Sequence, residues 1–562
     1  MTFCHPGVVK KRVAVIGAGP SGLATVKALL EEGHIPVCFE KAESLGGVFR
    51  FGESDGVVWY SCRLTSSGLL TAFSDFPVTA ERAEHMRAHE YVSYLSSYCE
   101  TFDLLRHIRF GARVDAISSD QKGGWRLRFV DAHGEHDDCF DSVAICSGLH
   151  QYPYVPSLAG AETFTGTLMH GSQYRRSEQV AGKKVLIVGA GESGADIVAE
   201  VAEHAGETVL SLRRGVAVVS RRSFGRPRDY QTSRILNGAA HWVFQTRNPE
   251  DDRKRNIYRA VFLPLVIVDK CLQILYRVVW ETLPLLFSTR LEEIKANLET
   301  RRITKQLLRE SGGTVAEQFG TKDDDFVRAI AVGKCRRTGA IARIEGGRVL
   351  FEDGSQLEPD IIILCTGFET RMPFLSEDIA AAPRFLHTFN PDVGASLGFI
   401  GFLRPAFGAI PPLAELQARW FALVQSGQRE LPSREAMQQS IANWRSYRAH
   451  IFRAVRGRLD HLVDHTPFCD ALAAQIGCKP GWRELRRESF AFRLRFFAAP
   501  FVAAQYRLVG PHAKKSLARD VITKLPIAHP WPDLINLYLR WLMSRVLHRA
   551  LGEDFSPKLA LD

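Results

Sequence analysis

Two short glycine-rich segments carry the strongest chemical signal in the chain. Both follow the pattern G-x-G-x-x-G, and their glycines are Gly17, Gly19, Gly22, Gly189, Gly191 and Gly194. Between a strand and a helix, the first glycine permits a tight turn, the second lets backbone N–H groups approach a pyrophosphate, and the third allows close helix–strand packing. The positive end of the helix adds attraction for the anion. Each segment therefore predicts a dinucleotide site.

The residue that ends the next strand differs in charge between the two copies. In the first copy it is Glu40, whose carboxylate can accept hydrogen bonds from a free ribose 2′-hydroxyl such as that of FAD. In the second copy it is Arg213, followed by Arg214, and a guanidinium pair favours a 2′-phosphate. The sequence therefore predicts FAD at the first site and NADPH, in preference to NADH, at the second, with electrons passing from NADPH to the flavin.

The elements that position these sites are predicted from the apolar runs around them. RVAVI and KVLIV precede the glycines, and apolar residues at helical spacing follow them. We expect an α/β protein with two Rossmann-like dinucleotide-binding domains. The expected boundaries are 1–164 and 331–430 for the FAD domain, 165–330 for the NADPH domain, about 223–322 for a helical insertion in it, and 431–562 for a helical C-terminal region. The strands expected after residue 330 are interpreted as a return of the chain to the first sheet.

Composition excludes several classes of protein. The chain has 562 residues, of which 46% are hydrophobic and 24% charged, as in ordinary globular proteins. Its net charge of +10 suits a phosphate-bearing ligand or an anionic membrane surface, but no basic arm or zinc-finger spacing indicates a nucleic-acid partner. The 11 scattered cysteines include no C-x-x-C pair, which favours a reducing, cytoplasmic location. No metal site is expected, because the His and Cys residues within 133–139 lie in a predicted hairpin turn and match no zinc pattern.

A further set of motifs identifies a family resemblance. The segment FTGTLMHGSQY, with Phe164, Gly166, His170 and Tyr174, resembles the F-x-G-x-x-x-H-x-x-x-[FYW] signature of class B flavoprotein monooxygenases. Its terminal Tyr is similar to the version found in flavin-containing monooxygenases. The stretches GGVFRF, SDFP, CTGF and GAIPPLAELQARW are similar to the same family, and the resemblance covers roughly residues 10 to 425.

The resemblance implies an activity and further cofactor contacts. In this family NADPH reduces the flavin, the reduced flavin captures dioxygen as a C4a-hydroperoxide, and one oxygen atom passes to a soft nucleophile, an amine nitrogen or a thioether sulfur of a small organic substrate. The implied alternatives are Baeyer–Villiger oxidation of a ketone by the same intermediate, an NADPH oxidase, and a non-catalytic nucleotide-binding flavoprotein. Cofactor contacts are implied for Gly46, Gly47, Phe164, Gly166, Tyr174, Thr366 and Gly367, while His170 is expected at the hinge between domains, supporting NADP⁺.

One departure from the family pattern lies before the SDFP motif. The family commonly has an Asn there, close to the reacting part of the flavin, and this chain has Thr65. A hydroxyl cannot reproduce the two donors and the carbonyl acceptor of an amide. Ser66 or Ser67 could supply the missing contact. Thr65, Ser66 and His170 are therefore the candidate catalytic residues.

Two apolar segments raise the question of a membrane. Residues 258–287 are interrupted by charges, so they lack the ~20 apolar residues that a spanning helix needs. Residues 533–551 place polar side chains at four-residue intervals, which predicts an amphipathic helix with a wide apolar face flanked by arginines. We expect peripheral membrane association through these two segments. The alternatives for the apolar face are the protein core and a partner in a homodimer.

Overall fold

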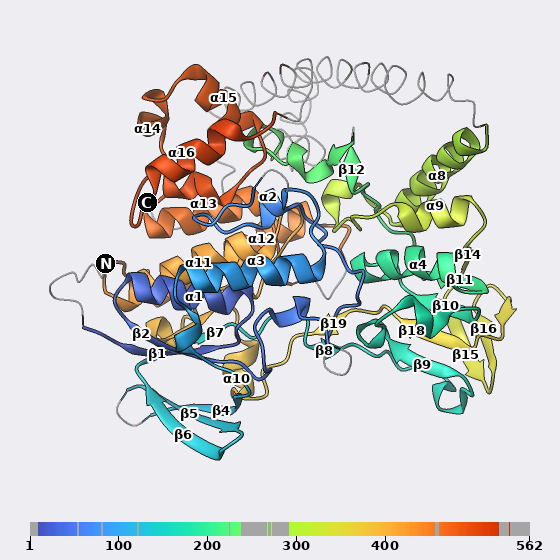
Figure 1. Cartoon of the computed structure of the whole chain (residues 1–562), viewed down its shortest axis with the longest axis horizontal. Coiled ribbons are helices and arrows are strands. Elements are labelled where there is room, and N and C mark those ends of the chain that lie inside the picture. The colour runs from blue at the N-terminus through green and yellow to red at the C-terminus, as the bar shows by residue number, and fades with distance from the viewer. Residues whose placement is uncertain are drawn as a thin grey trace.

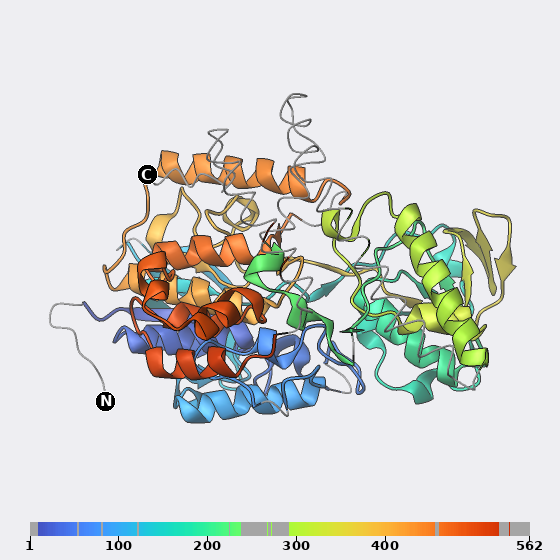
Figure 2. The ribbon, with the colours of Figure 1, turned by 90° about the horizontal axis from the view of Figure 1, so that it is seen from above.

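The protein has two lobes, each built on its own five-stranded sheet (Figures 1 and 2). A computed structural model describes residues 9–52, 56–79, 82–120, 123–223, 225–237, 291–455 and 460–527, with the single positions 267, 271, 535 and 539. The helices that follow each glycine turn lie against the sheet of their own lobe. The predicted α/β fold with two Rossmann-like units is confirmed.

The first sheet is entirely parallel and has the strand order β20-β7-β1-β2-β3. Its strands are β1 (Arg12–Ile16), β2 (Ile35–Phe39), β3 (Ile108–Arg109), β7 (Ser142–Ile145) and β20 (Leu397–Phe399). Side chains of β1 alternate between two cores, because successive residues of a strand face opposite sides of the sheet. Val13 and Val15 pack towards α1 (Pro20–Glu31) and α11 (Ile410–Gln425), whereas Ala14 and Ile16 pack towards a small antiparallel sheet. That small sheet contains β4 (Arg113–Ser119), β5 (Trp125–Asp131) and β6 (Gly134–Phe140).

The second sheet is also parallel, with the order β14-β11-β10-β18-β9. Its strands are β9 (Thr167–His170), β10 (Lys184–Val188), β11 (Glu207–Ser211), β14 (Arg336–Thr338) and β18 (Ile361–Leu364). One core joins Val185 and Ile187 to α4 (Glu192–His204) and α9 (Asp325–Ala331). The opposite core joins Leu186 to a second antiparallel sheet of β15 (Ile341–Glu345), β16 (Arg348–Phe351) and β17 (Gln356–Leu357).

The expected return of the chain to the first sheet after residue 330 is wrong. Strand β18 pairs with β10 in the second sheet, where Val185 lies opposite Ile361 and Val188 opposite Leu364. The chain rejoins the first sheet only at β20. The error has a physical cause, because strands buried on both faces of a parallel sheet all read as continuous apolar runs, and nothing in IIIL distinguishes one sheet from the other.

Two connections between the lobes run side by side. Strand β8 (Tyr152–Pro153) leaves the first lobe and β19 (Phe368–Glu369) returns to it, and the two strands pair in antiparallel fashion. Figure 1 shows this pair between the lobes. The carboxyl ends of β7 and β18 lead directly into this crossing, so both glycine turns lie near it.

The remaining described elements are mostly helical. They are α2 (Gly68–Thr71), α3 (Ala88–Thr101), α8 (Leu291–Glu310), α10 (Glu377–Ala381), α12 (Arg434–Ile451), α13 (His465–Ile476), α14 (Trp482–Arg486), α15 (Phe490–Ala498) and α16 (Lys515–Lys524), with the short strands β12 (Arg222–Ser223), β13 (Arg226–Pro227), β21 (Arg404–Pro405) and β22 (Leu462–Val463). Among the described residues, no helix has both the length and the apolar character to cross a membrane. The segments 258–287 and 533–551, to which membrane contact was assigned, lie outside the described residues except at single positions.

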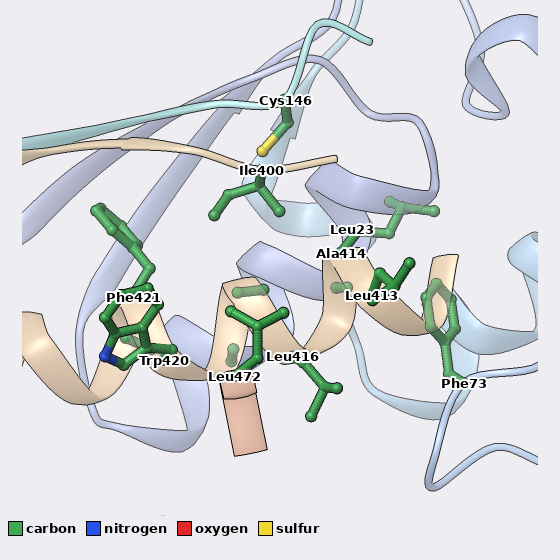
Figure 3. Close-up of a cluster of buried hydrophobic side chains, with 14 of the residues drawn as sticks. Leu23, Phe73, Cys146, Ile400, Leu413, Ala414, Leu416, Trp420, Phe421 and Leu472 are labelled. Atoms are coloured by element: carbon green, nitrogen blue, oxygen red, sulfur yellow. The ribbon is translucent and has the colours of Figure 1, made fainter. Parts of the chain in front are cut away.

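Helix α11 is buried along its whole length between the first sheet and the C-terminal helices. It packs against α1 on one side and α13 on the other, and Figure 3 shows Leu413, Leu416, Trp420 and Phe421 in this core. Its polar residues are also buried, and each has a partner. Gln417 accepts a hydrogen bond from the backbone N–H of Gly401 at 2.9 Å. Most buried polar groups in folded proteins are paired in this way.

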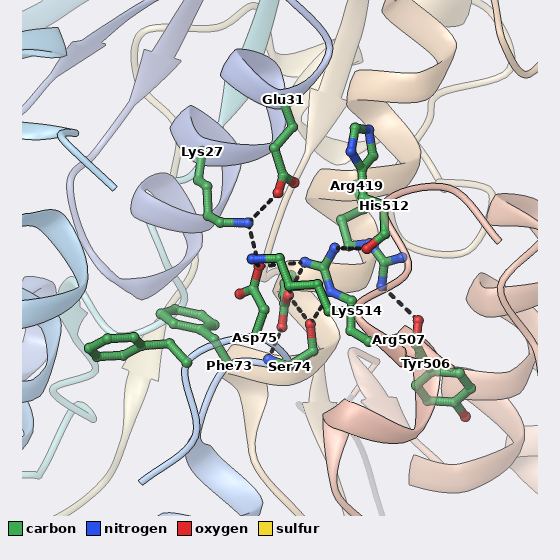
Figure 4. A network of polar contacts seen from close by, with 12 residues as sticks. Lys27, Glu31, Phe73, Ser74, Asp75, Arg419, Tyr506, Arg507, His512 and Lys514 are labelled. Carbon is green, nitrogen blue, oxygen red and sulfur yellow. Dashed lines mark hydrogen bonds and ion pairs between the residues drawn. The ribbon is translucent and has the colours of Figure 1, made fainter. Parts of the chain in front are cut away.

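A buried network of charges joins α11 to the C-terminal region and to the SDFP segment, residues 74–77 (Figure 4). Arg507, which is 1% exposed, donates to Glu415 at 2.9 Å and lies 3.2 Å from Asp75. Asp75 also contacts Lys27 of α1 at 2.6 Å and Lys514 at 2.9 Å. Burial acts to raise the pKa of Asp75, but the charges of Arg507, Lys27 and Lys514 outweigh it and hold the pKa below its usual range. Segments far apart in sequence are thus held together by charges that, apart from the partly exposed Lys514, are almost fully buried.

Replacement of Asp75 by Asn should destabilise the protein by about 3–5 kcal/mol at neutral pH, because the buried Lys27 and Arg507 and the partly exposed Lys514 lose their shared anion. The low pKa fixes the pH dependence. The stabilisation is complete above the unfolded-state pKa of about 4 and is lost only as acid protonates the folded carboxylate. Urea unfolding of both proteins should therefore show a constant difference from about pH 5 to 8 that narrows in stronger acid.

The control is Asp520→Asn, which removes an exposed carboxylate that contacts Lys524 at 2.7 Å within α16. This variant should unfold almost as the parent does, because exposed pairs contribute little. Equal stability of Asp75→Asn and the parent at pH 7 would show that the network is not stabilising.

Candidate functional site

The first glycine turn joins β1 to α1, and close packing requires glycine there. Gly17 has a φ of +104°, in the left-handed region that favours glycine. A Cβ added to Gly22 would lie 1.8 Å from the carbonyl oxygen of Gly17, well inside contact distance. The helix can therefore start directly against the turn, with its free N–H groups directed at the edge of the sheet.

The other residues predicted for the first site converge on the same turn. A Cβ on Gly47 would lie 3.1 Å from the Cα of Gly19, so the GGVFRF loop covers the turn closely. The carboxylate of Glu40 accepts hydrogen bonds from the backbone N–H groups of Ala18 at 2.7 Å and Ala42 at 2.9 Å. These bonds fix its position at the end of β2, and its remaining lone pairs stay available for a ribose hydroxyl.

A cavity of about 480 Å³ lies next to Glu40. Its lining includes Lys41, Ala42, Arg50 and Arg113. The lining also contains the carboxylate of Asp131, and the glycine turn itself does not contribute to it. The residues of the first site fit a dinucleotide with an unmodified ribose.

The second glycine turn repeats the geometry of the first. Gly189 has a φ of +97°, and a Cβ on Gly194 would lie 2.2 Å from the carbonyl oxygen of Gly189. No atom lies within 4 Å of the position that a Cβ on Gly191 would take, so this residue borders open space. Arg213 and Arg214 follow β11 and are exposed, and within the described part of the chain neither guanidinium has a hydrogen-bond or ion-pair partner. The residues of the second site fit a phosphorylated dinucleotide.

The F-x-G-x-x-x-H segment positions the crossing between the lobes. The Nδ1 atom of His170 accepts a hydrogen bond from the N–H of Ser172 at 3.1 Å, so Nε2 carries the proton and donates to the carbonyl of Gly367 at 3.0 Å. Burial lowers the pKa of His170, which keeps the ring neutral and this arrangement intact. His170 thereby fixes the backbone at the start of β19. It is a positioning residue in the described structure.

The other signature residues also support the fold around this crossing. A Cβ on Gly166 would lie 2.6 Å from the ring of Phe164, which explains the glycine. Tyr174 is fully buried in the core of the second lobe. Thr366 donates its hydroxyl proton to the carbonyl of Tyr154 at 2.5 Å and so ties the two connections together.

The segment proposed as catalytic lies where the two lobes meet. The hydroxyl of Ser66 donates to the carbonyl of Gly408 at 2.8 Å, and the backbone N–H of Ser67 donates to Asp229 at 2.5 Å. Ser66 is 5% exposed, so its hydroxyl is committed to fixing the Gly408 loop. Thr65 is less buried than its two neighbours. Of the candidates in this segment, Thr65 has the side chain most available to a ligand.

Sequence reasoning missed several ionisable groups at this junction. Arg221 contacts Asp196 of α4 at 2.8 Å, and burial raises the pKa of Asp196. His85 and Asp229 lie close together beside the Ser66 segment, and burial lowers the pKa of His85 and raises that of Asp229. No motif marks these residues, because the segments that hold them meet only when the lobes fold together.

Comparison with known proteins is consistent with this geometry. The model of the FMO-like family, described as flavin-binding monooxygenase-like, matches residues 10–241 and 263–527. The chain belongs to this family. It is 34% identical to a 4-hydroxybenzoate brominase (decarboxylating) of Marinomonas mediterranea, over 96% of this chain and 98% of that protein. It is 30% identical to human flavin-containing monooxygenase 2, over 92% of this chain and 91% of that protein.

Solved structures show the same fold. S-allyl-L-cysteine S-oxygenase from Allium sativum matches with a TM-score of 0.58 and 22% identity, over 92% of this chain and 99% of that one. An NADP-bound steroid monooxygenase matches with a TM-score of 0.57 and 17% identity, over 83% of this chain and 97% of that one. The predicted family is confirmed, and membership implies a flavin-dependent monooxygenase.

The glycines of the second turn allow a matched pair of substitutions. Gly194→Ala should lower the melting temperature, because its Cβ would overlap the backbone of Gly189. Gly191→Ala should fold normally, since its φ of −71° suits alanine and its Cβ meets no protein atom. It should nevertheless weaken NADP⁺ binding roughly 10-fold or more, because the methyl group occupies the path of the pyrophosphate. Unchanged NADP⁺ affinity in a folded Gly191→Ala protein would show that the coenzyme does not bind at this turn.

The exposed arginines allow a test of coenzyme choice. The double variant Arg213→Ala, Arg214→Ala should raise the KM for NADPH by on the order of 10- to 100-fold and change that for NADH little, because only NADPH carries the 2′-phosphate. The control removes the same charge from Arg343 and Arg348, which lie on the β15–β16 hairpin. Equal effects of the first double variant on both coenzymes would contradict the assignment.

Proposed function

We propose that this protein is an FAD- and NADPH-dependent monooxygenase, with FAD at the Gly17 turn and NADPH at the Gly191 turn. The observation that carries the proposal is the pairing of two unlike glycine turns across one crossing. Glu40 lies beside the first turn. Arg213 and Arg214, which are exposed and have no ion-pair partner among the described residues, lie beside the second. The family match over nearly the whole chain supports the same assignment.

A bound flavin would accept hydride from NADPH and activate dioxygen. The protein's own residues position the cofactors and exclude water from the site. Gly17, Gly19 and Gly22 let the first cofactor approach the sheet edge, and Glu40 orients its ribose. His170 fixes the crossing through Gly367 and so holds the two sites at a set spacing. The Ser66–Gly408 hydrogen bond fixes the loop before α11 against the Thr65 segment.

The oxygen acceptor has two candidates, each supported by a different comparison. The first is a halide in the presence of a hydroxylated aromatic acid, since two relatives of 34% and 32% identity are 4-hydroxybenzoate brominases (decarboxylating). That overall reaction balances when the aromatic acid, bromide, dioxygen, NADPH and two protons give the aryl bromide, carbon dioxide, NADP⁺ and two waters. The second is an amine nitrogen or thioether sulfur, since flavin-containing monooxygenase 2 also matches at 30% identity. We favour the first, because those relatives match over the greater share of the chain.

Steady-state assays of the flavin-loaded enzyme should decide between the acceptors. We expect NADPH oxidation to be coupled to product with 4-hydroxybenzoate plus bromide, and to yield mostly hydrogen peroxide with methyl phenyl sulfide, a tertiary amine or cyclohexanone. Oxygen uptake, NADPH absorbance and product mass are measured together. Coupled sulfide or amine oxidation would select the second acceptor, and lactone formation would indicate Baeyer–Villiger chemistry. Peroxide alone with every compound would indicate an oxidase, and a protein that takes up no flavin would overturn the proposal.

A further inference from the structure

A cluster of basic side chains lies at the junction of the lobes and belongs to none of the cofactor motifs. It consists of Arg404, His150 and His461. Arg404 begins β21, shortly after edge strand β20, and its backbone N–H donates to the carbonyl of His461 at 2.9 Å. His150 follows β7 in the same sheet. We propose that this cluster binds the carboxylate of an aromatic acid substrate, an inference that rests on the function proposed above.

The guanidinium of Arg404 is placed between the two nucleotide turns. Its Cζ lies 3.7 Å from the centre of the Phe319 ring. Phe319 is two residues before Thr321, whose hydroxyl donates to the carbonyl of Ala190 in the second turn at 2.9 Å. The cluster therefore bridges the carboxyl edge of the first sheet and the second glycine turn. Ligands of open α/β sheets bind at this edge.

Arg404 is half-buried, and within the described part of the chain its guanidinium has no hydrogen-bond partner. Among the described residues no carboxylate forms an ion pair with it. The buried Arg419 also lacks an anion, but its guanidinium donates to the carbonyls of Tyr506 and Pro511. Arg234, by contrast, contacts Asp470 at 3.0 Å.

Burial lowers the pKa of Arg404, and the charge of Glu192 acts to raise it. Glu192 itself lies 4.0 Å from Lys322. The contact with the Phe319 ring replaces only part of the lost hydration. The N–H groups of the Arg404 guanidinium are therefore arranged to receive an anion from a ligand.

The two histidines act as neutral donors beside it. Burial, followed by the charge of Arg404, lowers the pKa of His150 to about 3 and that of His461 to about 4. Asp460 acts to raise the pKa of His461, but it is exposed and contacts Arg448 at 2.8 Å. Each ring is therefore neutral at pH 7 and offers one N–H. A carboxylate could accept a bidentate pair from the guanidinium and further hydrogen bonds from the imidazoles.

Aromatic rings beside the cluster favour a planar ligand. Phe319 lies against the guanidinium, and Phe368 meets the ring of His150 edge-on at 5.6 Å. Phe368 also meets His170 at 5.1 Å, which connects the cluster to the residue that fixes the crossing. Such walls can stack on a benzene ring whose carboxylate reaches Arg404.

The cluster would recognise an oxyanion, which either the carboxylate of an aromatic acid or a phosphate of NADPH could supply. The phosphates already have their own partners in the free N–H groups at Gly191 and in Arg213 and Arg214. A carboxylate is therefore the better match for Arg404.

Calorimetric titration of the flavin-loaded enzyme measures this recognition without turnover. The probes are 4-hydroxybenzoate and its uncharged analogue 4-hydroxybenzamide. The parent should bind the acid on the order of 10- to 100-fold more tightly than the amide, because only the acid forms charge-assisted bonds. Arg404→Gln should abolish that preference and Arg404→Lys should retain part of it, since lysine keeps the charge but not the fork. The control Arg384→Gln removes another guanidinium, which lies 3.8 Å above the Phe399 ring, and should keep the preference.

The comparison of acid and amide on the parent needs no variant, so the proposal stays testable if Arg404→Gln does not fold. Equal affinity of the parent for both probes, or an unchanged preference in Arg404→Gln, would overturn it. A loss of NADP⁺ affinity in Arg404→Gln with acid binding intact would assign the cluster to the coenzyme. Tight acid binding without any coupled oxidation would instead refute the proposed function while supporting the site.

Discussion

The steric demand at the two glycine turns is the constraint from which the rest of the site follows. Cβ atoms at Gly22 and Gly194 would lie 1.8 and 2.2 Å from the carbonyl oxygens of Gly17 and Gly189. Only glycine lets a helix begin so close to its strand, and this closeness brings the helix N–H groups to the sheet edge. Two such turns in one chain give two anion sites, and the β8–β19 crossing then sets their spacing.

The first glycine turn is held in place by the packing of the first lobe, and buried charges contribute to that packing. Arg507 and Glu415 bring the C-terminal region against α11, while Asp75 brings in α1 and the SDFP segment. Charges with so little exposure are stable only while every partner is present, so the network tolerates few alternative arrangements. Further towards the second lobe, Ser67 and Asp229 add a direct hydrogen bond. The Thr65 segment is thus held between both halves of the structure.

Local patterns predicted the local elements, and long-range contacts limited the rest. The glycine turns, Glu40 and the strands beside them could be predicted because the relevant atoms lie within about 30 residues of one another in a βαβ unit. Strand β18 was assigned to the wrong sheet because the sequence IIIL does not indicate the strand with which it pairs. Tyr174 is buried in the core of the second lobe, a position that the motif alone does not indicate, and its cofactor contact stays a prediction. Arg404 was overlooked because its isolation from carboxylates is a property of the folded surroundings.

The two kinds of arginine in this junction differ in how they can act on an anion. Arg213 and Arg214 are exposed, so salt screens them over about 10 Å, and they suit a coenzyme that must bind and leave in each cycle. Arg404 is half-buried and lies against the ring of Phe319, where screening by salt is weaker than at an exposed site. A half-buried guanidinium also rejects neutral ligands, because water must be removed from it without compensation. If both proposals hold, the exposed arginines attract NADPH and the half-buried Arg404 discriminates between substrates, so that the two sites do not compete for the same anion.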